Sequence, residues 1–126
     1  MTAPTILIVD DDDSIREITQ LALEMVGGWT VVSANGGAMA LELAREHQPD
    51  AVLLDVMMPD MDGPTTFRHL QADEATRGIP VILLTAKVQV GDRQVWDDLA
   101  VAGVIPKPFD PMTLTTEVAA LLDWET

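Results

Sequence analysis

The sequence predicts a single α/β domain in which helices cover both faces of a parallel sheet. The 126 residues suit one domain that can build its own core. Short, continuous apolar runs, typical of strands buried in parallel sheets, alternate with stretches whose apolar residues recur at helical spacing. The connections between these stretches are short, and no repeat or linker interrupts them. Right-handed crossovers are therefore expected to bring the strands together in one sheet.

The first strand–helix unit opens the chain. Residues 5–9 are rich in β-branched side chains and predict a buried strand, which ends on four consecutive aspartates at 10–13. The pattern Ser14-Ile15-Arg16-Glu17 follows, and Ser14 or Asp13 is expected to cap a helix there. That helix is predicted to stop at Gly27-Gly28. Its apolar positions are Ile15, Ile18, Leu21, Ala22, Met25 and Val26.

The next stretches repeat this arrangement. Residues 29–34 predict a second strand, and Asn35-Gly36-Gly37 turns into a helix that ends before Pro49. The run Ala51-Val52-Leu53-Leu54 predicts a third strand, which ends on Asp55. A loop rich in Pro, Asp and Gly comes next, and a third helix is expected from Gly63-Pro64.

The second half of the chain predicts two further units. Residues 79–84 form a fully apolar strand that closes on Thr85, and a fourth helix is expected within 90–102. Residues 103–106 predict a short fifth strand. Pro106 cannot donate to a ladder, so this strand is expected at the edge of the sheet. Asp110 is expected to cap the last helix.

Composition excludes several classes of function. A formal charge of −14 with seven Lys and Arg argues against direct nucleic-acid binding, which needs clustered basic residues. The chain lacks cysteine, so neither disulfides nor a thiolate metal site is available. No apolar run is long enough to span a membrane, and the N-terminus does not look like a signal peptide. A cytoplasmic location is therefore expected.

Chemically active side chains follow the ends of several predicted strands. Because the carboxyl ends of parallel strands share one edge of a sheet, these side chains are expected to form a single pocket. They are Asp10, Asp11, Asp55, Thr85 and Lys107. Two carboxylates roughly 5 Å apart repel by about 3 kcal/mol at an effective dielectric near 20, which favours a bound cation. Oxygen ligands with open positions suit Mg²⁺.

Four motifs in one frame carry a resemblance to a known family. They are Val9-Asp10-Asp11, the stretch from Leu54 to Gly63, Leu84-Thr85-Ala86 and Lys107-Pro108-Phe109. Together they resemble the receiver domain of two-component response regulators, including chemotaxis-type single-domain regulators. The resemblance covers residues 1–126 as one receiver domain with no output domain. It implies a flavodoxin-like fold with a five-stranded sheet in the order 2-1-3-4-5.

The resemblance also implies a role for each matching residue. Asp55 would be the phosphoacceptor, taking a phosphoryl group from a phosphohistidine with Mg²⁺ as cofactor. The implied metal ligands are Asp11 and Asp55 directly, Asp10 through water, and the backbone carbonyl of Met57. Lys107 would pair with one phosphoryl oxygen, and Thr85 would hydrogen-bond another. The implied partner is a sensor histidine kinase or phosphotransfer protein, and the domain would act as a switch rather than a turnover enzyme.

The implied output is a changed binding face at about residues 90–122 for a downstream protein that the sequence does not identify. Whether a homodimer forms is left open. The family commonly has an aromatic residue where this chain has Val104, which argues against an aromatic-flip mechanism. Met57 and Lys87 occupy positions that often tune the lifetime of the acyl phosphate. The Lys107-Pro108 bond is expected to be cis, as it often is in the family.

Two other classes of function compete with this interpretation. A Mg²⁺-dependent phosphatase with an aspartyl nucleophile would need a general acid two residues after Asp55, where Met57 stands. A flavodoxin-like flavin binder would need a phosphate loop after the first strand, where four aspartates stand instead. Other conspicuous residues are given structural or surface roles. His47 and His69 are expected in solvent, and packing is expected for Met25, Met39, Met112 and Trp124.

Overall fold

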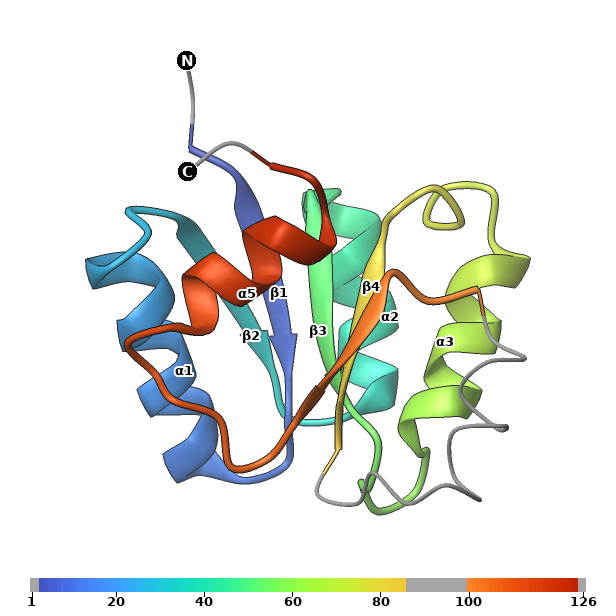
Figure 1. The fold of residues 1–126 in the computed structure, drawn as a ribbon. Helices are drawn as coiled ribbons and strands as arrows, with labels where there is room; N and C mark the ends of the chain where they lie inside the picture. The colour runs from blue at the N-terminus through green and yellow to red at the C-terminus, as the bar shows by residue number, and fades with distance from the viewer. Residues whose placement is uncertain (1–2, 86–99, 125–126) are drawn as a thin grey trace.

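The computed structural model describes residues 3–85 and 100–124, which form a parallel sheet between two layers of helices (Figure 1). The strands are β1 (Thr5–Val9), β2 (Thr30–Ala34), β3 (Ala51–Asp55), β4 (Val81–Thr85) and β5 (Gly103–Pro106). The helices are α1 (Asp13–Met25), α2 (Gly37–His47), α3 (Gly63–Ala72) and α5 (Leu114–Leu121). The strand order is β2-β1-β3-β4-β5. The predicted topology is confirmed, and so is the edge position of the strand that contains Pro106.

Two apolar layers arise because successive side chains of a strand point to opposite faces. Leu7, Val52 and Leu83 pack with α2 and α3 on one face. Ile8, Leu53 and Ile82 pack with α1 and α5 on the other. The central strands therefore carry apolar side chains on both faces, as expected for a sheet covered on both sides.

The register between neighbouring strands places the predicted polar residues at one edge of the sheet. β1 and β3 pair in parallel up to Val9 and Leu54, and Asp55 pairs with Leu84 of β4. Thr85 pairs with Pro106, so Lys107 is the next residue beyond the sheet on β5. All the residues predicted to form the pocket therefore leave the sheet at the same edge. The cis bond expected between Lys107 and Pro108 is present.

Two expected helix caps are wrong. The residue that caps α1 is Asp12, rather than the expected Ser14 or Asp13. Its carboxylate accepts hydrogen bonds from the backbone N–H groups of Ser14 and Ile15 at 2.9 and 3.1 Å. Asp110 accepts from the Met112 N–H at 2.9 Å, but this closes a turn that precedes the last helix. The regular helix begins at Leu114 and has no side-chain cap.

The expected fourth helix lies mostly outside the described residues, and its described end, residues 100–102, is not helical. The prediction of packed methionines is wrong, because Met25, Met39 and Met112 are 79%, 43% and 69% exposed. Trp124 does pack, with its ring 5.4 Å from that of Trp29 in an edge-to-face contact. His47 and His69 are exposed, as predicted.

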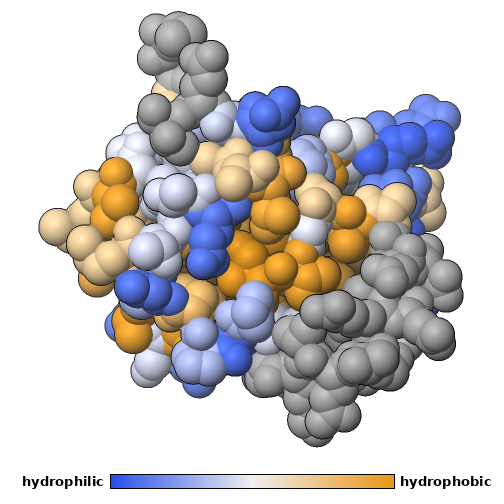
Figure 2. All heavy atoms as spheres, in the orientation of Figure 1, coloured by the Kyte–Doolittle hydropathy of each residue, from blue (hydrophilic) through white to orange (hydrophobic). Residues whose placement is uncertain are grey.

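Apolar side chains also gather on the outer face of α1. Ile18 and Leu21 are half exposed, although their helical spacing matches that of core residues. Figure 2 shows apolar side chains spread over the face that α1 and α5 cover. A groove of about 350 Å³ lies there between α1 and the segment after β5, and Ile15, Ile18 and Lys107 help to line it. Among the helices of residues 3–85 and 100–124, none has the length and apolar character to cross a membrane.

Candidate functional site

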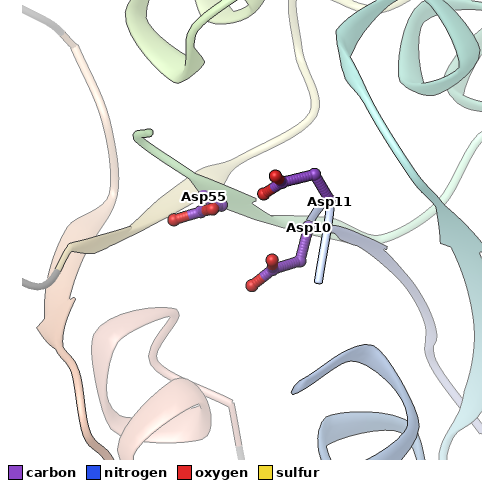
Figure 3. Close-up of side chains that lie close together, drawn as sticks. All are labelled: Asp10, Asp11 and Asp55. Atoms are coloured by element: carbon purple, nitrogen blue, oxygen red, sulfur yellow. The ribbon is translucent and has the colours of Figure 1, made fainter. Parts of the chain in front are cut away.

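Three carboxylates converge at the carboxyl edge of the sheet (Figure 3). Asp10 and Asp11 follow β1, and Asp55 is the last residue of β3. One oxygen from each lies within 4.8 Å of the others. Asp10 and Asp55 are only 1% and 5% exposed, whereas Asp11 is exposed to solvent. The convergence that the sequence predicted for these side chains is therefore observed.

A single ammonium group enters this acidic site from the segment after β5. The Nζ atom of Lys107 lies 2.8 Å from Oδ2 of Asp10 and 3.0 Å from Oδ1 of Asp55. The backbone N–H of Lys107 donates to the Thr85 carbonyl at 2.7 Å, which extends the β4–β5 ladder as far as the lysine. The fold thus holds Lys107 between two carboxylates that are separated from it by 97 and 52 residues in the chain.

Burial and charge set the protonation of the site. Burial raises the pKa of Asp55, the Lys107 hydrogen bond lowers it in part, and the Asp10 charge raises it again. For Lys107, burial alone would lower the pKa, but hydrogen bonds from its ammonium to Asp10 and Asp55 outweigh burial and raise it. Among the residues that the structure describes, the single ammonium of Lys107 cannot neutralise three carboxylates, so this part of the site favours a further cation.

The residues present fit Mg²⁺. All three side chains offer oxygen, which Mg²⁺ prefers, and Mg²⁺ usually binds through a few carboxylates and completes its ligands with water and phosphate. Asp11 is exposed, so one side of the site is open to solvent. Asp10, Asp11 and Asp55 would hold the ion, and its positive charge would offset the repulsion among the three carboxylates.

The loop after β1 is fixed by hydrogen bonds within itself. The Asp12 N–H donates to Oδ1 of Asp10 at 2.9 Å. Arg16, on the first turn of α1, donates to the main-chain carbonyl of Asp10 at 2.9 Å and pairs with Asp13. Sequence reasoning gave Arg16 no role at the site. A basic residue one helical turn after an acidic cluster is a signal that could have identified it.

The loop after β3 turns tightly against the end of its own strand. The N–H of Gly63 donates to the Val56 carbonyl at 2.9 Å. A Cβ atom on Gly63 would lie 2.4 Å from the Asp55 carbonyl oxygen, so only glycine permits this approach. Asp62 caps α3 by accepting from the Thr65 N–H at 2.8 Å. Asp55 is therefore held from both directions, by its strand and by the start of α3.

Three of the remaining predicted residues, Thr85, Met57 and Val104, are described by the structure. Thr85 ends β4 and is 2% exposed. Met57 lies just beyond Asp55 and is 71% exposed. Val104 is partly buried against the core layer of α2 and α3. Lys87, the second position predicted to tune acyl-phosphate lifetime, lies outside the described residues.

The fold and the site define an α/β signalling domain with a carboxylate-rich, metal-binding edge. The chain belongs to the response regulator receiver domain family, which it matches over residues 6–119. Receiver domains of this family act as phosphoacceptor switches in two-component signalling. The phosphatase and flavin-binding interpretations gain no support from this match.

Curated relatives are similar in sequence and longer. The transcriptional regulator RpaA of Synechocystis sp. is 40% identical over 119 residues, which are 94% of this chain and 49% of RpaA. The phosphate regulon regulator PhoB of Pseudomonas aeruginosa is 38% identical over 122 residues, 97% of this chain and 53% of PhoB. The chain therefore spans about half the length of these relatives.

Solved structures confirm the fold. The chemotaxis response regulator CheY4 of Vibrio cholerae superposes with a TM-score of 0.88 at 28% identity, covering 95% of this chain and 99% of CheY4. The receiver domain of the sensor histidine kinase PA1611 of P. aeruginosa gives a TM-score of 0.85 at 27% identity. That match covers 97% of this chain and 99% of the PA1611 domain, which has magnesium coordinated in its active-site cleft.

Proposed function

We propose that Asp55 accepts a phosphoryl group from a phosphohistidine on a sensor histidine kinase or phosphotransfer protein. The observation that carries this proposal is the position of the Asp55 carboxylate. Two further carboxylates lie close enough to share a metal ion with it. The ammonium of Lys107 lies 3.0 Å from one of its oxygens. With Mg²⁺ bound, Asp55 would lie between the metal ion and the ammonium of Lys107, and this suits phosphoryl transfer because the reaction depends on positioning and charge neutralisation.

The transfer itself is a single displacement at phosphorus. An Asp55 carboxylate oxygen forms a bond to phosphorus while the bond between phosphorus and the histidine nitrogen breaks. The imidazole leaves with the electron pair of that bond and takes a proton from solvent. The product is an acyl phosphate on Asp55. Water later cleaves it to inorganic phosphate and restores the carboxylate, so the domain returns to its starting state.

Each surrounding residue has a proposed part in this reaction. Asp11 and Asp55 would bind Mg²⁺ directly, Asp10 would bind it through water, and the Met57 carbonyl would complete the protein ligands. Lys107 already contacts Asp55 and would move its hydrogen bond to a phosphoryl oxygen. Thr85, buried at the end of the neighbouring strand, would hydrogen-bond another oxygen. Met57 is exposed beside the nucleophile and would limit the access of water.

The proposed output is a change in the face formed by about residues 90–122, of which β5 and α5 are described. Phosphorylation adds charge and acceptor oxygens beside Thr85, and a shift of that residue would alter the segment that follows β4. Val104 is too small to act as an aromatic gate, so the change would pass through Thr85 and Lys107. The identity of the downstream protein, homodimer formation, the cytoplasmic location and the lack of nucleic-acid binding stay predictions.

Phosphate incorporation tests the assignment of Asp55. The purified chain is incubated with acetyl phosphate and Mg²⁺, and intact-mass spectrometry measures the added phosphoryl group. We expect incorporation that requires Mg²⁺ and that hydroxylamine reverses, because hydroxylamine cleaves acyl phosphates. Asp55→Asn should incorporate none.

Asp50→Asn is the matched control. Asp50 stands at the opposite edge of the sheet, where its carboxylate accepts a hydrogen bond from the Thr5 N–H at 2.7 Å. This variant should incorporate phosphate like the wild type. Equal incorporation by the wild type and Asp55→Asn would overturn the proposal. Sustained turnover of a small phosphate ester would favour a phosphatase instead.

A further inference from the structure

Arg16 lies between the acidic loop and the first turn of α1. One nitrogen of its guanidinium donates to the Asp10 main-chain carbonyl at 2.9 Å, and the other pairs with the Asp13 carboxylate. Its side chain is 19% exposed, while that of Asp13 is 82% exposed. The bond to the Asp10 carbonyl is therefore the sheltered one. Among the basic residues that the structure describes, Arg16 and Lys107 are the two that contact residues 10–13.

The bond to the Asp10 carbonyl controls the direction of Asp11. That oxygen belongs to the rigid peptide plane that joins Asp10 to Asp11. Holding the oxygen fixes the rotation of the plane and hence the direction in which the Asp11 side chain leaves the backbone. Asp11 is exposed, and within the described residues its carboxylate accepts no hydrogen bond. Its orientation toward Asp55 therefore depends on the backbone.

We propose that Arg16 is a positioning residue for the metal site. Its two-pronged contact with Asp10 and Asp13 holds the Asp10–Asp11 peptide so that the Asp11 carboxylate faces Asp55. The inference rests on the proposed function only in taking this cluster as the Mg²⁺ site. Arg16 itself touches neither the metal ligand atoms nor the phosphoacceptor.

Electrostatics and positioning predict opposite effects of removing Arg16. A guanidinium close to the site repels a divalent cation, so loss of its charge alone would tighten Mg²⁺ binding. Loss of a positioning contact would weaken binding, because Asp11 would then sample directions that do not face Asp55. Residues that orient metal ligands typically contribute about 10-fold or more to metal affinity. The sign of the change therefore separates the two effects.

The test measures Mg²⁺ affinity of the unphosphorylated full chain by isothermal titration calorimetry. Arg16→Gln should weaken Mg²⁺ binding roughly 10-fold. Arg16→Lys should weaken it to a similar degree, because one ammonium cannot reproduce the planar fork that spans both acceptors. The matched control is Arg45→Gln, which removes an arginine that pairs with Asp73 at 2.7 Å between α2 and α3. This control should leave Mg²⁺ affinity unchanged.

A kinetic readout separates positioning from general damage to the fold. The rate of phosphorylation by acetyl phosphate is measured against Mg²⁺ concentration. The half-saturating concentration should rise about 10-fold in both Arg16 variants while the plateau rate stays close to that of the wild type. If Arg16→Gln does not fold, Arg16→Lys decides the question. Unchanged or tighter Mg²⁺ binding in a folded Arg16 variant would overturn the inference, even where labelling still depends on Asp55.

Discussion

Two aspartates at the ends of one loop behave in opposite ways. Asp55 opens the β3–α3 loop, where it is buried beside other carboxylates, and burial raises its pKa. Asp62 closes the loop in solvent, and hydrogen bonds from Thr65 lower its pKa. The fold therefore disfavours the charge on Asp55 and favours the charge on Asp62. The same side chain destabilises the domain where it serves as the candidate phosphoacceptor and stabilises it where it caps a helix.

The difference comes from what each carboxylate faces. The Asp62 carboxylate accepts from the Thr65 N–H at the start of α3, where the helix supplies partial positive charge. Asp55 shares a single ammonium with Asp10 and lies close to Asp11. Excess negative charge at the site is unfavourable for folding, but it is what attracts a divalent cation. The comparison predicts that variants at the two ends will change stability in opposite directions.

Lys107→Met should give the largest effect. It leaves the buried carboxylates of Asp10 and Asp55 without their counter-charge. Breaking a buried ion pair from one side costs roughly 3 kcal/mol, so urea unfolding without Mg²⁺ should show a loss of this order. Saturating Mg²⁺ should restore part of it. A variant as stable as the wild type without Mg²⁺ would show that the ammonium does not compensate the site.

Gly63→Ala should give the next largest effect. The added methyl group would press on the Asp55 carbonyl at 2.4 Å and on the Val56 Cα at 2.9 Å, and neither backbone atom can move without shifting Asp55. Overpacking of this kind costs roughly 2 kcal/mol. Gly78→Ala is the matched control, because a Cβ there meets nothing within 4 Å. Urea unfolding should separate the two variants, and equal stability would contradict the close approach.

Asp55→Asn should stabilise the domain in Mg²⁺-free buffer at neutral pH. The amide removes repulsion from Asp10 and Asp11 and keeps an acceptor for Lys107, and a gain of roughly 1 to 2 kcal/mol is expected. Mg²⁺ should then reverse the ranking, because it stabilises the wild type by binding its folded form. Thermal unfolding with and without Mg²⁺ measures both effects. A destabilised variant in Mg²⁺-free buffer would contradict the comparison.

The pH dependence of this gain has a definite sign. The pKa of Asp55 is raised in the folded state from an ordinary value of 3.8, so the folded state holds its proton more tightly. Well below pH 3.8 the carboxyl is protonated in both states, and Asp55→Asn has no advantage through this group. The advantage grows as pH rises from 3.8 through the raised pKa, and it is constant above that. Urea unfolding of both proteins across this range measures it.

Sequence reasoning predicted the sheet and the convergence of the site because both depend on long-range patterns. Continuous apolar strands are possible only in a sheet covered on both faces, and such a sheet brings the residue after each strand to one edge. Asp10, Asp55 and Lys107 could therefore be placed together without knowledge of any contact.

The errors lie where local geometry decides between similar residues. Asp12, Asp13 and Ser14 are all competent helix caps, and the choice among them depends on a difference of one or two residues in where α1 begins. The exposure of Met25 was missed because helical spacing marks an apolar face but not whether another element covers it. Arg16 was missed because its place one turn after the acidic cluster suggests only an ion pair, and the sequence does not show its bond to the main-chain carbonyl of Asp10.

Asp62→Ala should give the smallest effect and the opposite sign to Asp55→Asn. Loss of the bond from the Thr65 N–H should destabilise the domain by about 1 kcal/mol at neutral pH. Because the folded pKa of Asp62 is lowered, the part of its contribution that depends on charge is present above pH 3.8 and lost as pH falls through the lowered value. Asp62→Asn is the matched control, since asparagine caps equally well but carries no charge. Urea unfolding should show that Asp62→Asn is nearly as stable as the wild type but lacks that pH dependence. If Asp62→Asn lost as much stability as Asp62→Ala, the stabilisation would come from the charge rather than from the cap.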